Sequence, residues 1–138
     1  MNAADPSQEL AQRWFQKAEN DLLNVENNLK ATRYPADTVC FHCQQAAEKY
    51  LKGFLAWHQV PFVKIHDLLE LLKQVTQISG AAEELSPSLL KLDQYAVQIR
   101  YPHEYGGTPS KSEVQEAVAA AYTVRKWIRH ALKLEEAQ

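Results

Sequence analysis

Two cysteines and a histidine lie close together in the first half of the chain and have the residue types of a metal or redox site. Two residues separate Cys40 from Cys43, and His42 is one of them. Thiolates and imidazoles are the usual ligands of zinc in proteins, and a Cys-x-x-Cys pair can also cycle between dithiol and disulfide. Three interpretations therefore compete: a metal site, a redox site and a pair of core cysteines.

Helical geometry favours the core interpretation. At about 100° per residue, His42 falls roughly 160° from Cys40, so it cannot join both sulfurs around one ion. The cysteines instead share an arc of about 100° with other buried residue types; this stripe consists of Cys40, Cys43, Ala47, Tyr50, Phe54 and Trp57. A structural zinc site needs four ligands, and no two of the remaining histidines have ligand spacing. We therefore predict no metal and no cofactor, with both cysteines packed as small hydrophobic residues.

The opposite side of this helical segment is predicted to face outward. It carries His42, Gln45, Glu48, Lys49 and Lys52. Phe41 projects among these polar residues, and two interpretations of it remain open. It contacts a partner, or the loop over residues 61–65 covers it.

A basic face near the C-terminus is a candidate for binding nucleic acid or nucleotide. Lys126, Arg129 and Lys133 recur on one side of a predicted helix together with Tyr122, and Arg125 lies beside them. Cations next to an aromatic ring suit phosphates and bases. The alternative is a solvated face whose cations complement the negative end of the helix dipole.

The elements that position these residues are predicted to be helical. Apolar residues recur at helical spacing in five segments, about 6–31, 35–58, 67–79, 86–100 and 110–131, and no segment has convincing strand alternation. Asp5, Asp67 and Ser110 are candidate N-caps, and Glu113 completes a capping box with Ser110. We predict an all-α protein, an antiparallel up-and-down four-helix bundle with one additional short helix, forming a single domain over residues 1–138.

Composition limits the partners and the compartment. The 138 residues carry a net charge of −2, so no overall positive field attracts nucleic acid, and any basic surface must be local. Two cysteines and the lack of a signal-peptide pattern favour a reducing, cytoplasmic setting. No membrane association is expected, because no run of 18 apolar residues occurs.

Several motifs together resemble the HEPN family, the helical nucleotide-binding domain of higher eukaryotes and prokaryotes. They are "WFQKAENDLLNVENNL" at 14–29, "CFHCQQAAEKYLKGFL" at 40–55, "KIHDLLELL" at 64–72 and then "RYP" at 100–102. The tripeptide Arg-Tyr-Pro also occurs at 33–35, but three residues are too few to define a repeat. The resemblance implies a four-helix bundle that forms a homodimer. It also implies a minimal nucleotidyltransferase partner, with which such proteins act as toxin and antitoxin, and RNA or nucleotide as ligand.

Active relatives are metal-independent ribonucleases with an arginine, four to six residues and a histidine, and in some toxins a tyrosine lies two residues after that histidine. By this resemblance Arg100 and His103 are the candidate catalytic residues, and Tyr105, with Tyr101, is the candidate for nucleotide modification or ligand binding. Only two residues separate Arg100 from His103. Histidine suits proton transfer near neutral pH, and arginine stabilises charge that develops on a phosphate.

The alternative is a non-catalytic subunit that binds a nucleotide or docks a nucleotidyltransferase through its helices. In that case Arg100 caps a helix C-terminus and His103 is a solvated loop residue.

Overall fold

The computed structural model describes residues 5–62, 67–98 and 107–134, and these residues are largely helical. The elements are α1 (Pro6–Leu29), α2 (Ala36–Trp57), α3 (Leu68–Ile78), the 3₁₀ helix η1 (Gly80–Leu85), α4 (Ser86–Asp93), α5 (Tyr95–Gln98) and α6 (Lys111–Ala131). The described ranges contain no β-strand, so the predicted all-α class is confirmed. None of the helices within these ranges combines the length and apolar character needed to span a bilayer.

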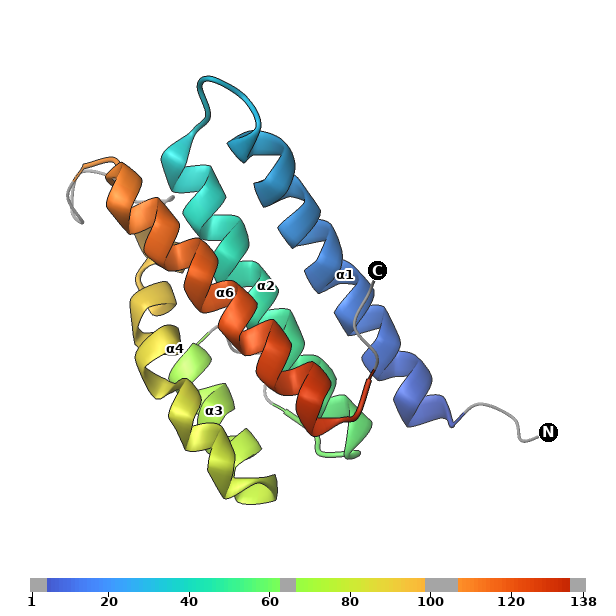
Figure 1. Ribbon diagram of the computed structural model, residues 1–138. Helices are drawn as coiled ribbons and strands as arrows, with labels where there is room; N and C mark the ends of the chain where they lie inside the picture. The colour runs from blue at the N-terminus through green and yellow to red at the C-terminus, as the bar shows by residue number, and fades with distance from the viewer. Residues whose placement is uncertain (1–4, 63–66, 99–106, 135–138) are drawn as a thin grey trace.

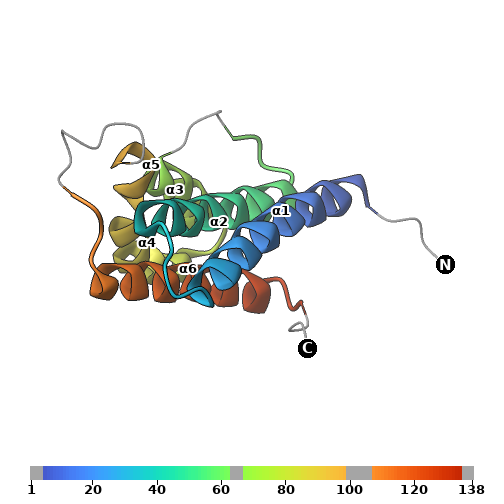
Figure 2. The same cartoon turned by 90° about the horizontal axis from the view of Figure 1, so that it is seen from above.

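Helix α2 is the centre of the molecule. Helices α1, α2 and α6 lie side by side, while α3 and α4 cover another side of α2 and α6 (Figures 1 and 2). Helix α2 contacts every other α-helix, with α1 as its most extensive neighbour. The core therefore forms around α2 rather than between equivalent helices.

The direction of α3 departs from strict up-and-down order. At the start of α2, the side chains of Cys40 and Tyr95 are hydrogen-bonded to each other. Near Tyr95, Asp93 accepts a hydrogen bond of 3.3 Å from the amide of Leu68, the first residue of α3. The side-chain amide of Gln74 donates a hydrogen bond of 3.1 Å to the carbonyl of Pro61, which lies four residues beyond the end of α2. Helix α3 therefore runs in the same direction as α2.

The predicted N-caps are confirmed. The carboxylate of Asp5 accepts a hydrogen bond of 2.8 Å from the amide of Ser7, and the carboxylate of Asp67 accepts from two amides in the first turn of α3. At the start of α6, the Ser110 hydroxyl accepts from the Glu113 amide at 3.1 Å, and the Glu113 carboxylate accepts from the Ser110 amide at 2.9 Å. These bonds satisfy amides that a helix leaves unpaired at its start.

Helices α2 and α6 both end in a Schellman motif built without glycine. After α2, the amide of Val60 donates to the carbonyl of Leu55 and the amide of Gln59 to the carbonyl of Ala56, at 2.9 and 3.0 Å. The same two bonds close α6. Gln59 and Lys133 occupy the left-handed position, with φ of 60° and 57°. Glycine usually occupies this position because it has no Cβ.

The predicted buried stripe of α2 is largely confirmed. All its members are buried except Trp57, which is partly buried. The apolar spacing in α1 also predicts Trp14 and Leu29 on its buried side. In the structure Phe15 is the core residue and stacks on Tyr50, whereas Trp14 is only partly buried. Leu29 is 38% exposed. It lies in the last turn of α1, at the edge of the packing between α1 and α2.

The prediction that the polar side of α2 faces outward is wrong for Glu48 and Lys52, which are 2% and 6% exposed. Lys52 donates to Glu48 at 2.9 Å, and its ammonium group lies 5.4 Å from the ring centre of Trp14 and 5.8 Å from that of Phe62. These aromatic faces and the carboxylate together compensate the buried ammonium charge. The prediction assumed a helix with one buried side, but α2 is covered on several sides.

His42 and Lys49 also face a neighbouring helix. Both bind the same carboxylate of α1: His42 Nδ1 lies 2.8 Å from Oδ1 of Asp21, and Lys49 Nζ lies 2.6 Å from Oδ2. Asp21 is buried, so these contacts compensate a charge that has been removed from water. Phe41 is partly buried, and the two interpretations of it remain predictions.

Candidate nucleotide-binding site

The residues predicted to be catalytic lie outside the described residues. Arg100 and His103, together with Tyr101 and Tyr105, belong to the segment between the end of α5 at Gln98 and the described residues that precede α6. Their roles therefore remain predictions. The surroundings of α6 are described, and they contain two hollows.

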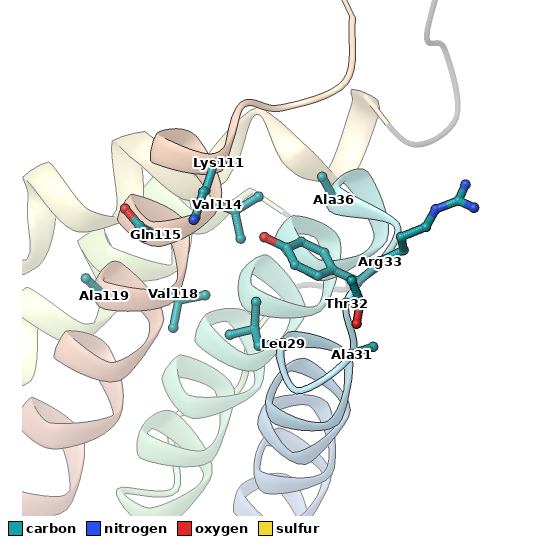
Figure 3. A pocket seen from close by; sticks show the side chains of 11 residues that line it. Leu29, Ala31, Thr32, Arg33, Ala36, Lys111, Val114, Gln115, Val118 and Ala119 are labelled. Atoms are coloured by element: carbon teal, nitrogen blue, oxygen red, sulfur yellow. The ribbon is translucent and has the colours of Figure 1, made fainter.

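The larger hollow lies between the α1–α2 turn and the first half of α6 (Figure 3). We call it the turn groove. Its volume is about 830 Å³, and it is lined by Leu29, Ala31, Thr32, Arg33, Tyr34, Ala36, Lys111, Val114, Gln115, Val118 and Ala119. Two local signals form it. Helix α1 ends at Leu29, so the chain turns before α2, and the capping box starts α6 one residue before Lys111.

The turn groove is positively charged. Arg33 extends from the turn and Lys111 from α6, and both side chains are exposed. Among the described residues neither cation forms an ion pair, and none of the residues that line the groove is acidic. Figure 3 shows the Arg33 guanidinium directed away from the groove, so binding requires this long side chain to change rotamer. Such changes at exposed residues take picoseconds to nanoseconds.

The floor of the turn groove is apolar. Val114 is buried, Val118 and Tyr34 are partly buried, and Leu29 closes the α1 side. Thr32 and Gln115 add a hydroxyl and an amide that can form hydrogen bonds. An apolar and aromatic floor next to these two cations suits a ligand with a planar ring and an anionic group.

A smaller hollow lies beside the second half of α6, and we call it the η1 hollow. Its volume is about 470 Å³, and Thr123, Lys126, Trp127 and His130 of α6 line it together with Glu84 of η1. Trp127 is partly buried because its ring packs against Phe54, with the ring centres 5.8 Å apart. The hollow therefore has an indole wall and a lysine next to one carboxylate.

The predicted basic face of α6 is divided between two sides of the helix. Tyr122 faces α1, where its hydroxyl donates a hydrogen bond of 2.5 Å to Glu26. The pKa of this tyrosine is raised, mainly by burial and to a smaller extent by the hydrogen bond to Glu26. Arg125 also faces α1 and donates to Glu19 at 2.8 Å. Lys126 instead lines the η1 hollow.

The other two predicted residues differ in position. Arg129 is partly buried in α6. Lys133 lies beyond the end of α6 in the left-handed conformation, so it does not continue the helical face. Of the three cations predicted to bind nucleic acid, only Lys126 lines one of the two hollows described above.

The two cysteines are core residues, as predicted. Both are fully buried, and burial raises the pKa of Cys40 to about 11 and that of Cys43 to about 12. The thiols are therefore protonated near neutral pH, whereas a metal ligand or nucleophile is a thiolate. No group of three metal-ligating side chains occurs among the described residues.

Arg33, Tyr34 and Lys111 line the turn groove, although they were not predicted from the sequence as ligand-binding residues. The available signal was the repeated Arg-Tyr-Pro tripeptide, whose first copy contains Arg33 and Tyr34. Lys111 had no local signal, because its role depends on α6 starting beside a turn almost eighty residues earlier in the chain.

Comparisons with known proteins agree on one family. The model of the HEPN domain matches residues 11–131. The crystal structure of TT1696 from Thermus thermophilus is similar with a TM-score of 0.73 and 28% identity, over 87% of this chain and 96% of that one. ST0689, described as an archaeal HEPN homologue, has the same fold, with a TM-score of 0.70 and 23% identity over 88% and 96% of the two chains. The comparison with curated proteins gave no match. Because the family model covers most of the chain, the protein belongs to the HEPN domain family.

Proposed function

We propose that this HEPN protein binds RNA or a nucleotide in the turn groove, as the HEPN subunit of a toxin–antitoxin-type pair with a minimal nucleotidyltransferase. The observation that carries the proposal is the lining of the groove. Arg33 and Lys111 are lining residues beside an apolar floor, neither has an ion-pair partner in the described part of the chain, and no carboxylate is among the lining residues. The family is of a nucleotide-binding and ribonuclease type, which agrees with this chemistry.

Binding is tested by fluorescence anisotropy with labelled adenosine and uridine nucleotides and short RNAs. We expect Arg33→Glu and Lys111→Glu each to weaken binding at least tenfold, because each reverses a charge at the groove. Lys91→Glu is the matched control, since Lys91 is exposed on α4 and lines neither hollow. Equal affinities of all three variants and the unmodified protein would exclude the turn groove.

A second candidate function is metal-independent RNA cleavage by Arg100 and His103. The observation that favours it is their place in the sequence, in the segment that leads to α6, whose first residue, Lys111, lines the turn groove. In the proposed reaction His103 accepts the proton of the RNA 2′-hydroxyl, whose oxygen attacks the adjacent phosphorus. Arg100 stabilises the charge on the phosphate oxygens while the bond to the 5′-oxygen breaks and that oxygen takes a proton from water, which leaves a 2′,3′-cyclic phosphate and a 5′-hydroxyl.

The cleavage test uses purified protein and RNA in the presence of a chelator. We expect cleavage to disappear in both Arg100→Ala and His103→Ala and to persist in Lys91→Glu. Cleavage that survives either alanine substitution contradicts the assignment of that residue. Absence of cleavage in every variant, with RNA binding retained, supports the non-catalytic alternative.

The partner and the oligomeric state have separate tests. We expect a homodimer in light scattering coupled to size-exclusion chromatography, and co-purification with a nucleotidyltransferase encoded beside this protein. Mass spectrometry after co-expression should show an added nucleotide on Tyr105, or on Tyr101. An unmodified Tyr101 and Tyr105 in a stable complex would leave docking as the role of this subunit.

A further inference from the structure

A strip of exposed residues on α6 joins the two hollows. It consists of Lys111, Gln115, Ala119, Thr123, Lys126 and His130, which recur three or four residues apart and are all exposed. The first three line the turn groove and the last three line the η1 hollow. The strip contains two lysines and no carboxylate, but the exposed Glu116 borders it, about 20° from Thr123 around the helix axis.

Small side chains lie where the two hollows approach each other. Ala119 is the last residue of α6 that lines the turn groove, and Thr123 is the first that lines the η1 hollow. The hydroxyl of Thr123 donates to the carbonyl of Ala119 at 2.9 Å, so it lies against the helix backbone. A chain that crosses α6 from one hollow to the other therefore meets a methyl group and a backbone-bound hydroxyl rather than a bulky side chain.

We propose that one single-stranded RNA occupies both hollows and crosses α6 between Ala119 and Thr123. This inference rests on the proposed function and specifies its ligand as an oligonucleotide. Gln115 lines the turn groove and Trp127 lines the η1 hollow, and they are twelve residues apart, which is about 18 Å along the helix axis. A stacked strand rises about 3.4 Å per nucleotide, so about five nucleotides separate the two positions.

The η1 hollow has the chemistry of a base-binding position. Trp127 offers part of an indole surface for stacking, and Lys126 and His130 can contact phosphate. Glu84 is unfavourable near a phosphate, but its carboxylate can accept hydrogen bonds from the exocyclic amino group of a base. The hollow therefore favours a base with an amino group, adenine, cytosine or guanine, over uracil.

The salt dependence follows from the cations in the two hollows. Arg33, Lys111 and Lys126 together neutralise about three phosphates, so the logarithm of the association constant should fall with the logarithm of salt concentration with a slope of about −2. Removing Lys126 should reduce the slope to about −1.4. A dinucleotide in the turn groove meets only Arg33 and Lys111, so its slope should not depend on Lys126.

The experiment compares a labelled dinucleotide with a labelled octanucleotide in fluorescence anisotropy at several salt concentrations. Both are 2′-O-methyl adenosine oligomers, which lack the hydroxyl needed for cleavage. We expect the octamer to bind at least tenfold more tightly than the dimer. Lys126→Gln and Thr123→Glu should each weaken the octamer about fivefold and leave the dimer unchanged, whereas Lys91→Gln should change neither.

The outcomes separate this inference from the proposed function. Equal affinities of dimer and octamer, with both lost in Lys111→Glu, would refute the RNA path across α6 and retain the turn groove as a nucleotide site. An octamer that binds tightly but is insensitive to Lys126→Gln and Thr123→Glu would also refute it. If neither oligomer binds, the proposed function is wrong as well. Circular dichroism on each variant confirms that loss of binding is not loss of fold.

Discussion

Gly53 permits the close approach of α1 and α2, and its replacement by alanine tests the packing of the core. A Cβ atom at this position would lie 2.3 Å from Cε1 and 2.7 Å from Cδ1 of Phe15. Ordinary contact begins near 3.4 Å, so the ring would have to move by about 1.1 Å. Phe15 is 4% exposed and stacks on Tyr50 with ring centres 5.9 Å apart, so it has little space to move.

Two opposing effects determine the size of the change. Overpacking a core costs about 1–3 kcal/mol, while alanine in place of a mid-helix glycine contributes about 1 kcal/mol of stability. The cost minus the gain is about 0–2 kcal/mol, and the short contacts with Phe15 favour the upper half of this range. We therefore expect Gly53→Ala to lower the free energy of unfolding by about 1–2 kcal/mol. Urea denaturation followed by circular dichroism measures this change. Gly80→Ala is the control, because nothing lies within 4 Å of its added Cβ.

A double-mutant cycle identifies Phe15 as the cause. In a Phe15→Leu background the ring is absent, so Gly53→Ala should cost at least about 1 kcal/mol less than in the unmodified protein. Two results would refute the reasoning. One is a Gly53→Ala variant that is more stable than the unmodified protein, as expected for an uncrowded helical glycine. The other is a coupling energy near zero between the two positions.

Three further predictions concern an ion cluster, a helix cap and the thiols. Asp21→Asn should lower the free energy of unfolding by about 1–3 kcal/mol in urea, because it weakens the contacts of a buried carboxylate with His42 and Lys49 of α2; an unchanged midpoint would contradict this. Ser110→Ala should cost about 1 kcal/mol by removing the capping box, and the neighbouring exposed Ser112→Ala should stay within about 0.5 kcal/mol of the unmodified protein. Cys40 and Cys43 should resist a thiol reagent at pH 8 until urea is added. Burial raises both pKa values above the ordinary 9.0, so the unfolded chain ionises first. The two thiols therefore leave the free energy of unfolding unchanged below pH 9 and lower it as the pH rises from 9 toward 11 for Cys40 and 12 for Cys43. The free energy of unfolding should fall less steeply with pH over this range when both cysteines are replaced by alanine.

The helices were predictable because their signals are local. The capping box at Ser110 and the cap at Asp67 are hydrogen bonds within one turn, so residue type and spacing suffice. The buried stripe of α2 follows from a period of 3.6 residues in the same way. Local signals do not specify how many neighbours a helix has. For that reason Glu48 and Lys52 were predicted on the outside, although α2 has neighbours on several sides.

The candidate site was less predictable because it depends on contacts distant in sequence. Arg33 belongs to a turn and Lys111 to a helix start, and each has an ordinary structural explanation alone. Only the packing of α6 beside the α1–α2 turn brings the two cations to one groove. The basic face of α6 was predicted on a regular helix, but Tyr122 and Arg125 are bound by acidic residues of α1 that the helical wheel does not contain.

The burial of α2 has a consequence for how this sequence can change. From Thr38 to Trp57 no residue is exposed, whereas α1 and α6 have exposed positions every three or four residues. In a library with every residue replaced in turn, α1 and α6 should therefore show a periodic alternation of tolerated and rejected positions. Helix α2 should instead appear as one nearly uninterrupted block of rejection. Because so few substitutions are tolerated there, we expect the sequence "CFHCQQAAEKYLKGFL" to change more slowly among relatives than the sequences of α1 and α6.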